Sequence, residues 1–103
     1  DEDYFWIQSV ELAEIAFLCI RPWDFFPDYE LDVPDDVQAQ IELDDPVDSE
    51  VFLLLTTHHE GEDLVDITAN LLGPIILNSS NLQARQVVLN NTDYSTRTPL
   101  VAA

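Results

Sequence analysis

Residues whose types could support chemistry gather in one short stretch of this sequence, between residues 58 and 63. His58, His59, Glu60, Glu62 and Asp63 include types that bind metal ions or transfer protons. Adjacent histidines on a strand end point to opposite sides, so both rarely reach one ion. The spacing therefore favours a solvated polar loop, and a metal-dependent enzyme is the less favoured alternative.

Other patterns that mark catalysis or ligand binding are missing. Gly61 and Gly73 are the only glycines and stand apart, which excludes the glycine-rich loops that cradle phosphates. A calcium loop would need twelve residues with a central glycine, and the acids around residues 44–50 lack it. Carboxylates are so abundant that no pair marks a catalytic acid and base. We therefore expect neither an enzyme nor a cofactor.

The charge of the chain is strongly one-sided. Twenty-one acidic residues face three arginines and no lysine, which gives a net charge of −18. Such a charge repels phosphate, so we expect no direct binding to nucleic acid. Two explanations of the acidity stay open. The charge could speed encounter with a basic partner, or the protein could come from a salt-adapted organism whose proteins are all acidic.

Length and composition indicate one domain over residues 1–103, with 47% hydrophobic residues to form a core. No apolar run reaches the roughly 18–20 residues of a membrane helix, and the acidic start is unlike a secretory leader. The single cysteine, Cys19, cannot form an internal disulfide and is expected to be a buried, inert thiol in a reduced cytoplasm. Because the chain has no methionine, we expect that a segment upstream is missing from it.

The segment that organises the predicted fold is residues 67–78. Two short apolar stretches are joined there at Gly73 and Pro74, which break a strand. Residues 79–84 have turn chemistry, and residues 85–89 resemble a third strand. Asn70 and Asn78 interrupt the apolar sequence, so their amides must find partners, which we expect to be backbone groups at the bend.

The rest of the chain predicts mostly strands. Strands are expected over residues 4–10, 15–20, 29–33 and 50–57. A single helical turn is expected at residues 11–14 and one helix at residues 34–43. Residues 21–29 are expected to form a loop or sheet edge that buries aromatic rings, and residues 90–100 a turn-rich tail. This pattern favours an all-β antiparallel barrel or pseudo-barrel with one short helix.

Five pieces of the sequence, in this order and spacing, resemble the FliW flagellar assembly factor family. They are Phe5-Trp6-Ile7-Gln8-Ser9-Val10, Ala16-Phe17-Leu18, Phe26-Pro27-Asp28-Tyr29, residues 68–78, and Gln86-Val87-Val88-Leu89 followed by Tyr94. The resemblance covers nearly the whole chain. The family's section before the first piece is not in this sequence, which agrees with the absence of methionine.

Three positions depart from the family's pattern. Arg21 stands where an acidic residue often precedes the proline, Gly73 where alanine is common, and Thr98 where histidine is common. These differences leave the expected fold intact, but partner contacts at the three positions are not carried over from the family.

The resemblance implies a β-barrel-like cytoplasmic protein that is not an enzyme and binds two partners in turn. One partner is flagellin, held before export. The other is CsrA, an RNA-binding regulator that represses flagellin synthesis and is captured once flagellin has left. The alternative function is a non-specific acidic decoy, which would bind many basic proteins with little discrimination.

The expected partner-binding residues fall in two stretches of sequence. They are Trp23, Phe25, Phe26, Asp28 and Tyr29 in the first, and Glu60, Glu62 and Asp63 in the second. Aromatic side chains dominate interface energetics, so the first stretch could anchor a partner. The more conservative interpretation of the same rings is that they plug one end of the barrel.

Overall fold

The structure is a computed structural model that describes residues 3–8, 16–90 and 92–100 of the chain. Within these ranges, an antiparallel sheet contains β1 (Tyr4–Gln8), β2 (Ala16–Ile20), β3 (Ser49–Glu60), β4 (Asp63–Ala69), β5 (Ile75–Asn78), β6 (Gln83–Gln86) and β7 (Thr98–Pro99). The helices are α1 (Pro22–Phe25), α2 (Asp35–Gln40) and the 3-10 helix η1 (Pro46–Asp48). The turn expected at residues 11–14 lies outside the described residues.

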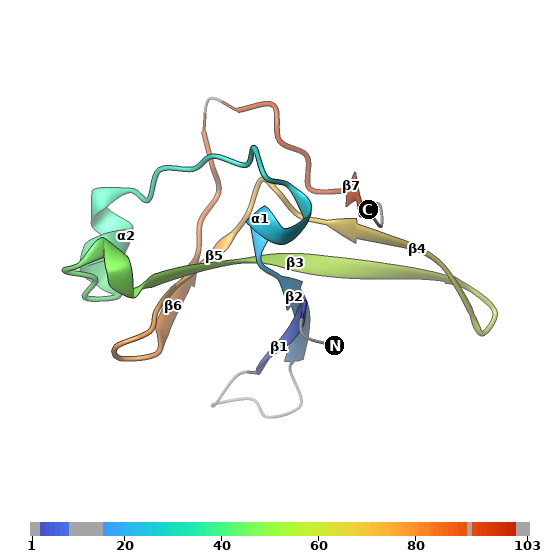
Figure 1. The fold of residues 1–103 in the computed structure, drawn as a ribbon, viewed down its shortest axis with the longest axis horizontal. Coiled ribbons are helices and arrows are strands. Elements are labelled where there is room, and N and C mark those ends of the chain that lie inside the picture. The colour runs from blue at the N-terminus through green and yellow to red at the C-terminus, as the bar shows by residue number, and fades with distance from the viewer. Residues whose placement is uncertain (1–2, 9–15, 91, 101–103) are drawn as a thin grey trace.

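Strand β3 is the central strand of the sheet and includes the strand predicted over residues 50–57. Its first residues, Ser49 to Phe52, pair with β5, and its last, Leu55 to Glu60, pair with β4. Between them, Leu53 and Leu54 pair with β2. Figure 1 shows β3 running the length of the molecule, with the β3–β4 hairpin extending to one side. Strand β3 therefore pairs with three other strands, β2, β4 and β5, and connects the two ends of the sheet.

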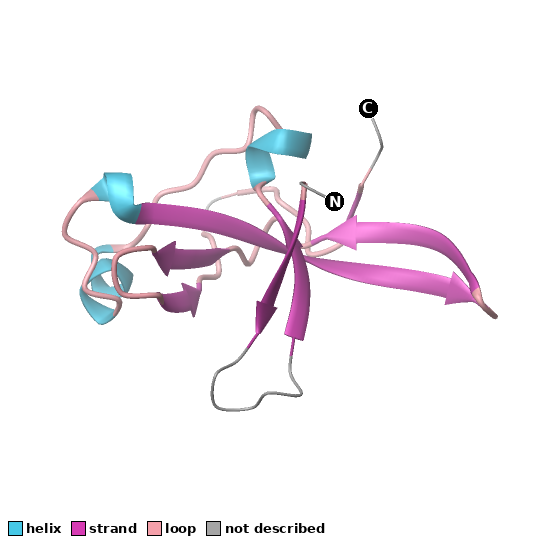
Figure 2. Ribbon diagram, turned by 60° about the horizontal axis from the view of Figure 1, so that its bottom comes forward, coloured by secondary structure: helices cyan, strands magenta, loops and turns pink. Residues whose placement is uncertain are grey.

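The expected all-β antiparallel fold is confirmed, but the expected closure of the sheet is wrong. The main strand order is β1-β2-β3-β4-β7, with β5 paired to the first part of β3 and β6 paired to β5. Strands β1 and β7 therefore lie at opposite ends of the order and do not pair with each other in the described part of the chain. Strand β7 contributes only two paired residues, one of them Pro99, which has no N–H to donate. Figure 2 shows the resulting open sheet with α2 and η1 at the end away from the β3–β4 hairpin.

The structure also corrects the number and length of the helices. Two short α-helices form in the described residues rather than one, because residues 22–25 make a helical turn where a loop was expected. Helix α2 ends at Gln40 rather than continuing to residue 43, because Glu42 adopts a positive φ of 55° that ends a right-handed helix. Pro34 precedes the first turn, which contains Asp35 and Asp36 as predicted.

Three other boundaries differ from the sequence prediction. Residues 29–33 alternate between buried and exposed as a strand would, but they have no strand partner. Residues 58–60 are strand rather than loop, so Gly61 and Glu62 alone form the turn between β3 and β4. Strand β6 begins at Gln83, which leaves residues 87–89 extended beyond its end.

The core consists of two adjoining clusters along β3. The first contains Ile20, Tyr29, Leu53, Ala69 and Leu71, and the second contains Ile41, Leu43, Val51, Ile76 and Val87. The half-buried side chains of Leu31 and Leu89 pack against both clusters. Among the described residues, no helix is long and apolar enough to cross a membrane.

Candidate functional site

Helix α1 begins the aromatic stretch that the sequence singled out. Proline suits the first helical position because it needs no N–H bond there, and Pro22 occupies it. The N–H of Phe26 donates to the carbonyl of Pro22 at 2.7 Å and closes the turn. The N–H of Tyr29 then donates to the carbonyl of Phe26 at 3.0 Å, so the chain doubles back and turns the Tyr29 ring inward.

Tyr29 is the anchor of this region. Its side chain is almost fully buried, and its hydroxyl donates to the carbonyl of Leu71 at 2.7 Å, in the bend between β4 and β5. The Tyr94 ring stacks on the Tyr29 ring with centroids 4.7 Å apart. Burial, and then the neighbouring Tyr94, raise the pKa of Tyr29 above its ordinary value, so the buried hydroxyl stays protonated and remains a donor.

The other aromatic side chains of this stretch differ in exposure. Phe25 and Phe26 are half-buried and pack against the first core cluster. Trp23 keeps 46% of its surface exposed, while its indole N–H donates to the carbonyl of Tyr29 at 2.9 Å. Phe25, Phe26 and Tyr29 therefore contribute to packing, and Trp23 is the ring of this stretch that presents a large surface to solvent.

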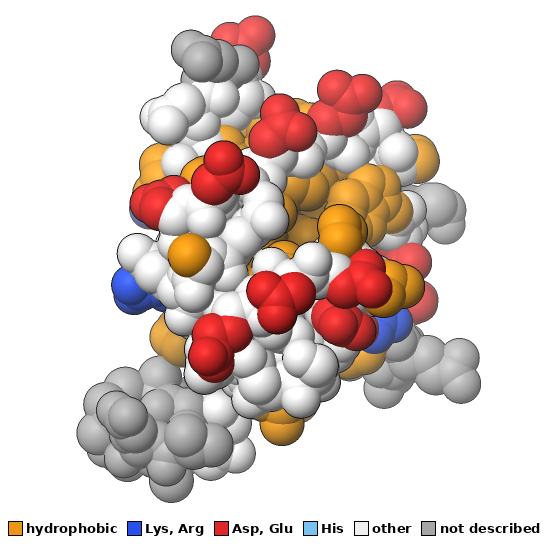
Figure 3. All heavy atoms as spheres, turned by 90° about the vertical axis from the view of Figure 1, so that its left-hand side faces the viewer, with side chains coloured by type: hydrophobic (Ala, Val, Ile, Leu, Met, Phe, Trp, Pro, Cys, Tyr) orange, Lys and Arg blue, Asp and Glu red, His pale blue; other side chains and the backbone are white. Residues whose placement is uncertain are grey.

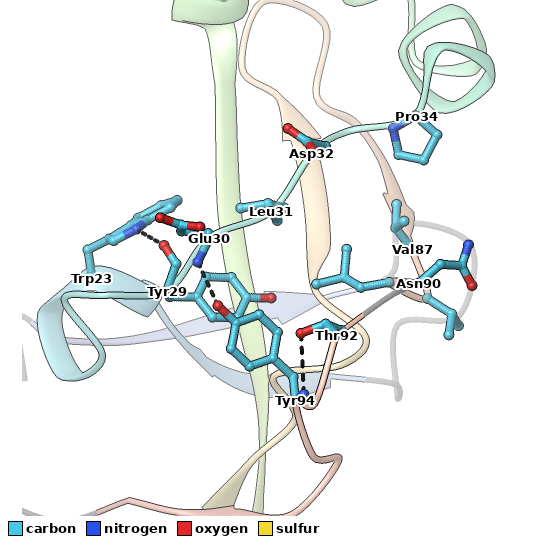
Figure 4. A pocket seen from close by; sticks show the side chains of 12 residues that line it. Trp23, Tyr29, Glu30, Leu31, Asp32, Pro34, Val87, Asn90, Thr92 and Tyr94 are labelled. Atoms are coloured by element: carbon cyan, nitrogen blue, oxygen red, sulfur yellow. Dashed lines mark hydrogen bonds between the residues drawn. The ribbon is translucent and has the colours of Figure 1, made fainter.

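A groove of about 670 Å³ opens beside these rings. Two segments distant in sequence form its walls, and the lining residues are Trp23, Tyr29, Glu30, Leu31, Asp32 and Pro34 from one segment and Val87, Val88, Leu89, Asn90, Thr92 and Tyr94 from the other. Figure 4 shows the two segments on either side of the stacked tyrosines. Figure 3 shows that, on the face carrying α2, hydrophobic side chains lie in a hollow with acidic side chains around it.

A second, smaller hollow of about 290 Å³ adjoins the same rings. Its lining includes Phe25, Phe26, Asp28 and Tyr29, all of which were predicted as partner-binding residues, together with Pro27, Leu71 and Tyr94. Tyr29 and Tyr94 line both hollows, so the tyrosine stack separates them. The structure thus brings the first predicted stretch together around one pair of rings.

The second predicted stretch lies elsewhere. Glu60 ends β3, Glu62 belongs to the turn, and Asp63 begins β4, all with exposed side chains. They form the tip of the β3–β4 hairpin, which Figure 1 shows extended away from α1. The predicted partner-binding residues therefore form two separate surfaces rather than one.

The histidines next to that tip belong to strand β3. The ring nitrogen Nε2 of His58 lies 3.5 Å from the hydroxyl of Thr68, and the His59 side chain is exposed. Among the described residues, no three histidine, cysteine, aspartate or glutamate side chains are grouped so that they could hold a metal ion. Cys19 is fully buried as predicted, and burial raises the pKa of its thiol to about 11, which keeps it in the unreactive protonated form.

The positive charges are placed away from the groove, whose described lining contains no arginine. Arg21 forms an ion pair with Glu50 at 3.0 Å, and its guanidinium lies 4.7 Å from the centre of the Phe5 ring. Arg85 donates to the side chain of Gln40 at 2.8 Å. Arg21, which departs from the family's pattern, thus has a structural role between β1, β2 and β3.

Several groove residues were not predicted from the sequence. Glu30, Asp32 and Val88 line the groove, but nothing in their own type or spacing marks them as functional. The sequence shows the alternation of apolar and polar residues over 29–33, and it shows Tyr94. That the two line the same groove depends on how the chain folds. Contacts between residues 64 positions apart, such as the Glu30 N–H with the Tyr94 hydroxyl at 2.8 Å, cannot be derived from local pattern.

Comparison with known proteins connects this geometry to a family. The chain is 43% identical over 101 residues to the flagellar assembly factor FliW of Treponema denticola, covering 98% of this chain and 67% of that protein. It is 37% identical to the FliW of Bacillus subtilis, covering 97% of this chain and 68% of that protein. It is 38% identical to the FliW of Magnetococcus marinus, covering 98% of this chain and 60% of that protein.

A solved structure has the same fold. The crystal structure of a flagellar assembly factor FliW superposes with a TM-score of 0.84 at 32% sequence identity, covering 98% of this chain and 70% of that one. The family model described as "FliW protein" matches residues 1–100. The chain therefore belongs to the FliW family.

Proposed function

We propose that this chain is a flagellar assembly factor that acts in the cytoplasm by binding proteins and catalyses no reaction. Its two partners are flagellin and the translational regulator CsrA, bound alternately, so that capture of CsrA relieves repression of flagellin mRNA. The observation that carries this proposal is the 43% identity, over 98% of the chain, to a flagellar assembly factor. The acidic surface and the groove are consistent with a binding protein.

The charge supports a basic partner in particular. A net charge of −18 without lysine attracts a basic RNA-binding protein over distances beyond contact. Such steering raises the association rate more than it raises the final affinity. We therefore expect the association rate with CsrA to fall at least about tenfold between 0.02 and 0.3 M NaCl, measured by stopped-flow fluorescence.

The direct test is a pull-down with purified partners. The immobilised chain is expected to retain flagellin and CsrA separately, and excess flagellin is expected to release bound CsrA. Failure to bind either protein would contradict the proposal. Lysozyme, a basic protein unrelated to flagella, serves as the control.

The control also tests the acidic decoy, which the net charge alone would support. A decoy would bind lysozyme and CsrA with similar affinity at the same salt concentration. The proposed function predicts that CsrA binds at least about a hundredfold more tightly, because a shaped interface adds contacts that charge alone does not provide.

A further inference from the structure

One wall of the groove has an unused strand edge. The N–H groups of Val87 and Leu89 donate to the carbonyls of Pro74 and Leu72, both at 2.9 Å. In an extended chain the backbone groups of the intervening residue point the other way, here to the side of the groove. Val88 makes no hydrogen bond with any other residue in the described part of the chain, and its side chain is 68% exposed.

The opposite wall has the same property. The N–H of Glu30 donates to the Tyr94 hydroxyl, which lines the groove, and the N–H of Asp32 is two residues further along the same side of an extended chain. Neither Leu31 nor Asp32 makes a hydrogen bond with other residues that the structure describes. At exposed positions such as Asp32 and Val88, backbone groups without a protein partner bond to water, which the backbone of a ligand can replace.

The side chains on these walls are sorted by polarity. Leu31 and Leu89 face the core and form an apolar floor, whereas Glu30 and Asp32 are exposed at the rim. The described lining contains two acids and no lysine or arginine. The groove volume of about 670 Å³ falls within the range of roughly 300–1,000 Å³ that ligand sites occupy.

We propose that this groove binds an extended peptide segment of a protein partner, which adds as a strand between residues 30–33 and residues 87–90 and carries basic residues alternating with apolar ones. Backbone hydrogen bonds to Val88 and Asp32 would supply affinity, as in other cases of strand addition. Apolar side chains of the segment would face Leu31 and Leu89. Its lysines or arginines would stand opposite Glu30 and Asp32, where cross-strand pairs of opposite charge are favourable.

Charge selects this occupant over the alternatives. A second copy of the chain would bring another net charge of −18 to an already acidic rim, and nucleic acid would bring phosphates, so both would be repelled. A helical segment satisfies its own backbone and would leave the donors of Val88 and Asp32 unpaired. The inference rests on the proposed function only in that the chain acts by binding a protein.

The charge part is tested with an acetylated synthetic peptide of alternating lysine and valine, with the glutamate–valine peptide as control, by isothermal titration calorimetry. The lysine peptide is expected to bind and the glutamate peptide not to bind.

The double variant Glu30→Gln, Asp32→Asn is expected to weaken binding about fivefold. The variant Glu62→Gln, Asp63→Asn loses the same charge at the hairpin tip and is expected to change binding less than about twofold. Equal effects of the two double variants would overturn the inference.

The strand part is tested on the backbone. Val88→Pro removes the free N–H but leaves the bonds of Val87 and Leu89, and it is expected to abolish peptide binding, whereas Val88→Ala retains it. In the unmodified protein, the peptide is expected to slow amide exchange at residues 32 and 88 specifically. Unchanged exchange at these amides, or tight binding by a folded Val88→Pro variant, would contradict strand addition.

The two proposals fail differently. If the chain retains flagellin or CsrA but does not bind the peptide, the groove inference is wrong and the proposed function stands. If it binds the peptide with the expected exchange pattern but retains neither protein, the groove is a peptide site and the proposed function is wrong.

Discussion

Tyr29 shows how one side chain determines the shape of the surface around the groove. Its ring lies in the core, its hydroxyl holds the Leu71 carbonyl in the bend between β4 and β5, and its backbone carbonyl accepts the indole N–H of Trp23. The Tyr94 ring stacks on the Tyr29 ring, and the Tyr94 hydroxyl accepts the N–H of Glu30, which joins the two walls of the groove. The buried Tyr29 and the partly buried Tyr94 therefore line both hollows together.

The mutation Tyr29→Phe is expected to lower the free energy of unfolding by about 1–3 kcal/mol, because the Leu71 carbonyl would be left buried without a partner. Urea unfolding measures this change. Tyr94→Phe is the matched control. Its hydroxyl meets an N–H at an exposed site, so the loss is expected to stay below about 1 kcal/mol. A larger loss at Tyr94 than at Tyr29 would contradict this assignment.

At the scale of elements, side-chain amides attach the β5–β6 hairpin to the end of α2, and Asn78 is the buried one. The Asn78 side chain is 1% exposed and donates to the carbonyls of Ile41 at 2.9 Å and Glu42 at 3.1 Å. Its oxygen accepts the N–H of Ser80 at 3.0 Å. The unusual backbone of Glu42, with positive φ, is thus held by a residue 36 positions away.

Asn78→Ala is expected to lower the free energy of unfolding by about 2–3 kcal/mol, since a buried amide is removed, the Glu42 carbonyl loses its donor and the Ile41 carbonyl keeps only Asn81. Asn81 also donates to Ile41, at 3.1 Å, but its side chain is exposed, so Asn81→Ala is expected to cost less than about 1 kcal/mol. Thermal unfolding of both variants would show the difference. Equal losses would mean that Asn78 does not hold the helix end.

For the whole molecule, the acidic charge opposes the compact state. Twenty-one acids outnumber three arginines, and one of these, Arg21, forms an ion pair with Glu50. Mutual repulsion among exposed carboxylates weakens folding and is screened by salt. Salt should therefore act in opposite directions on stability and on the rate of meeting a basic partner.

We expect the free energy of unfolding to rise by an amount on the order of 1 kcal/mol between 0.01 and 0.5 M NaCl. Urea unfolding at each salt concentration measures it. The triple variant Glu60→Gln, Glu62→Gln, Asp63→Asn removes three exposed acids and should show a smaller rise. A stability that is independent of salt would contradict the repulsion argument.

The sequence alone determined what local pattern and composition can determine. The apolar run of β3, the break at Gly73 and Pro74, the buried Cys19 and the strands on both sides of the bend follow from side-chain period and backbone chemistry. A polar amide in apolar sequence must be paired, and Asn70 accepts the N–H of Gly73 at 2.8 Å in the bend, as expected. Asn78 also bonds backbone groups, but its partners lie at the end of α2 and in the β5–β6 turn rather than at the bend.

Only the tertiary structure decided which residues meet. The sheet stays open in the described residues because β1 and β7, at the two ends of the strand order, do not pair, and that order is set by long-range pairing rather than local preference. For the same reason, the strand-like alternation of residues 29–33 became one wall of a groove, and the eight predicted partner-binding residues separated into two surfaces. Local pattern fixes which side of a segment is apolar, but the neighbour that covers it depends on the path of the whole chain.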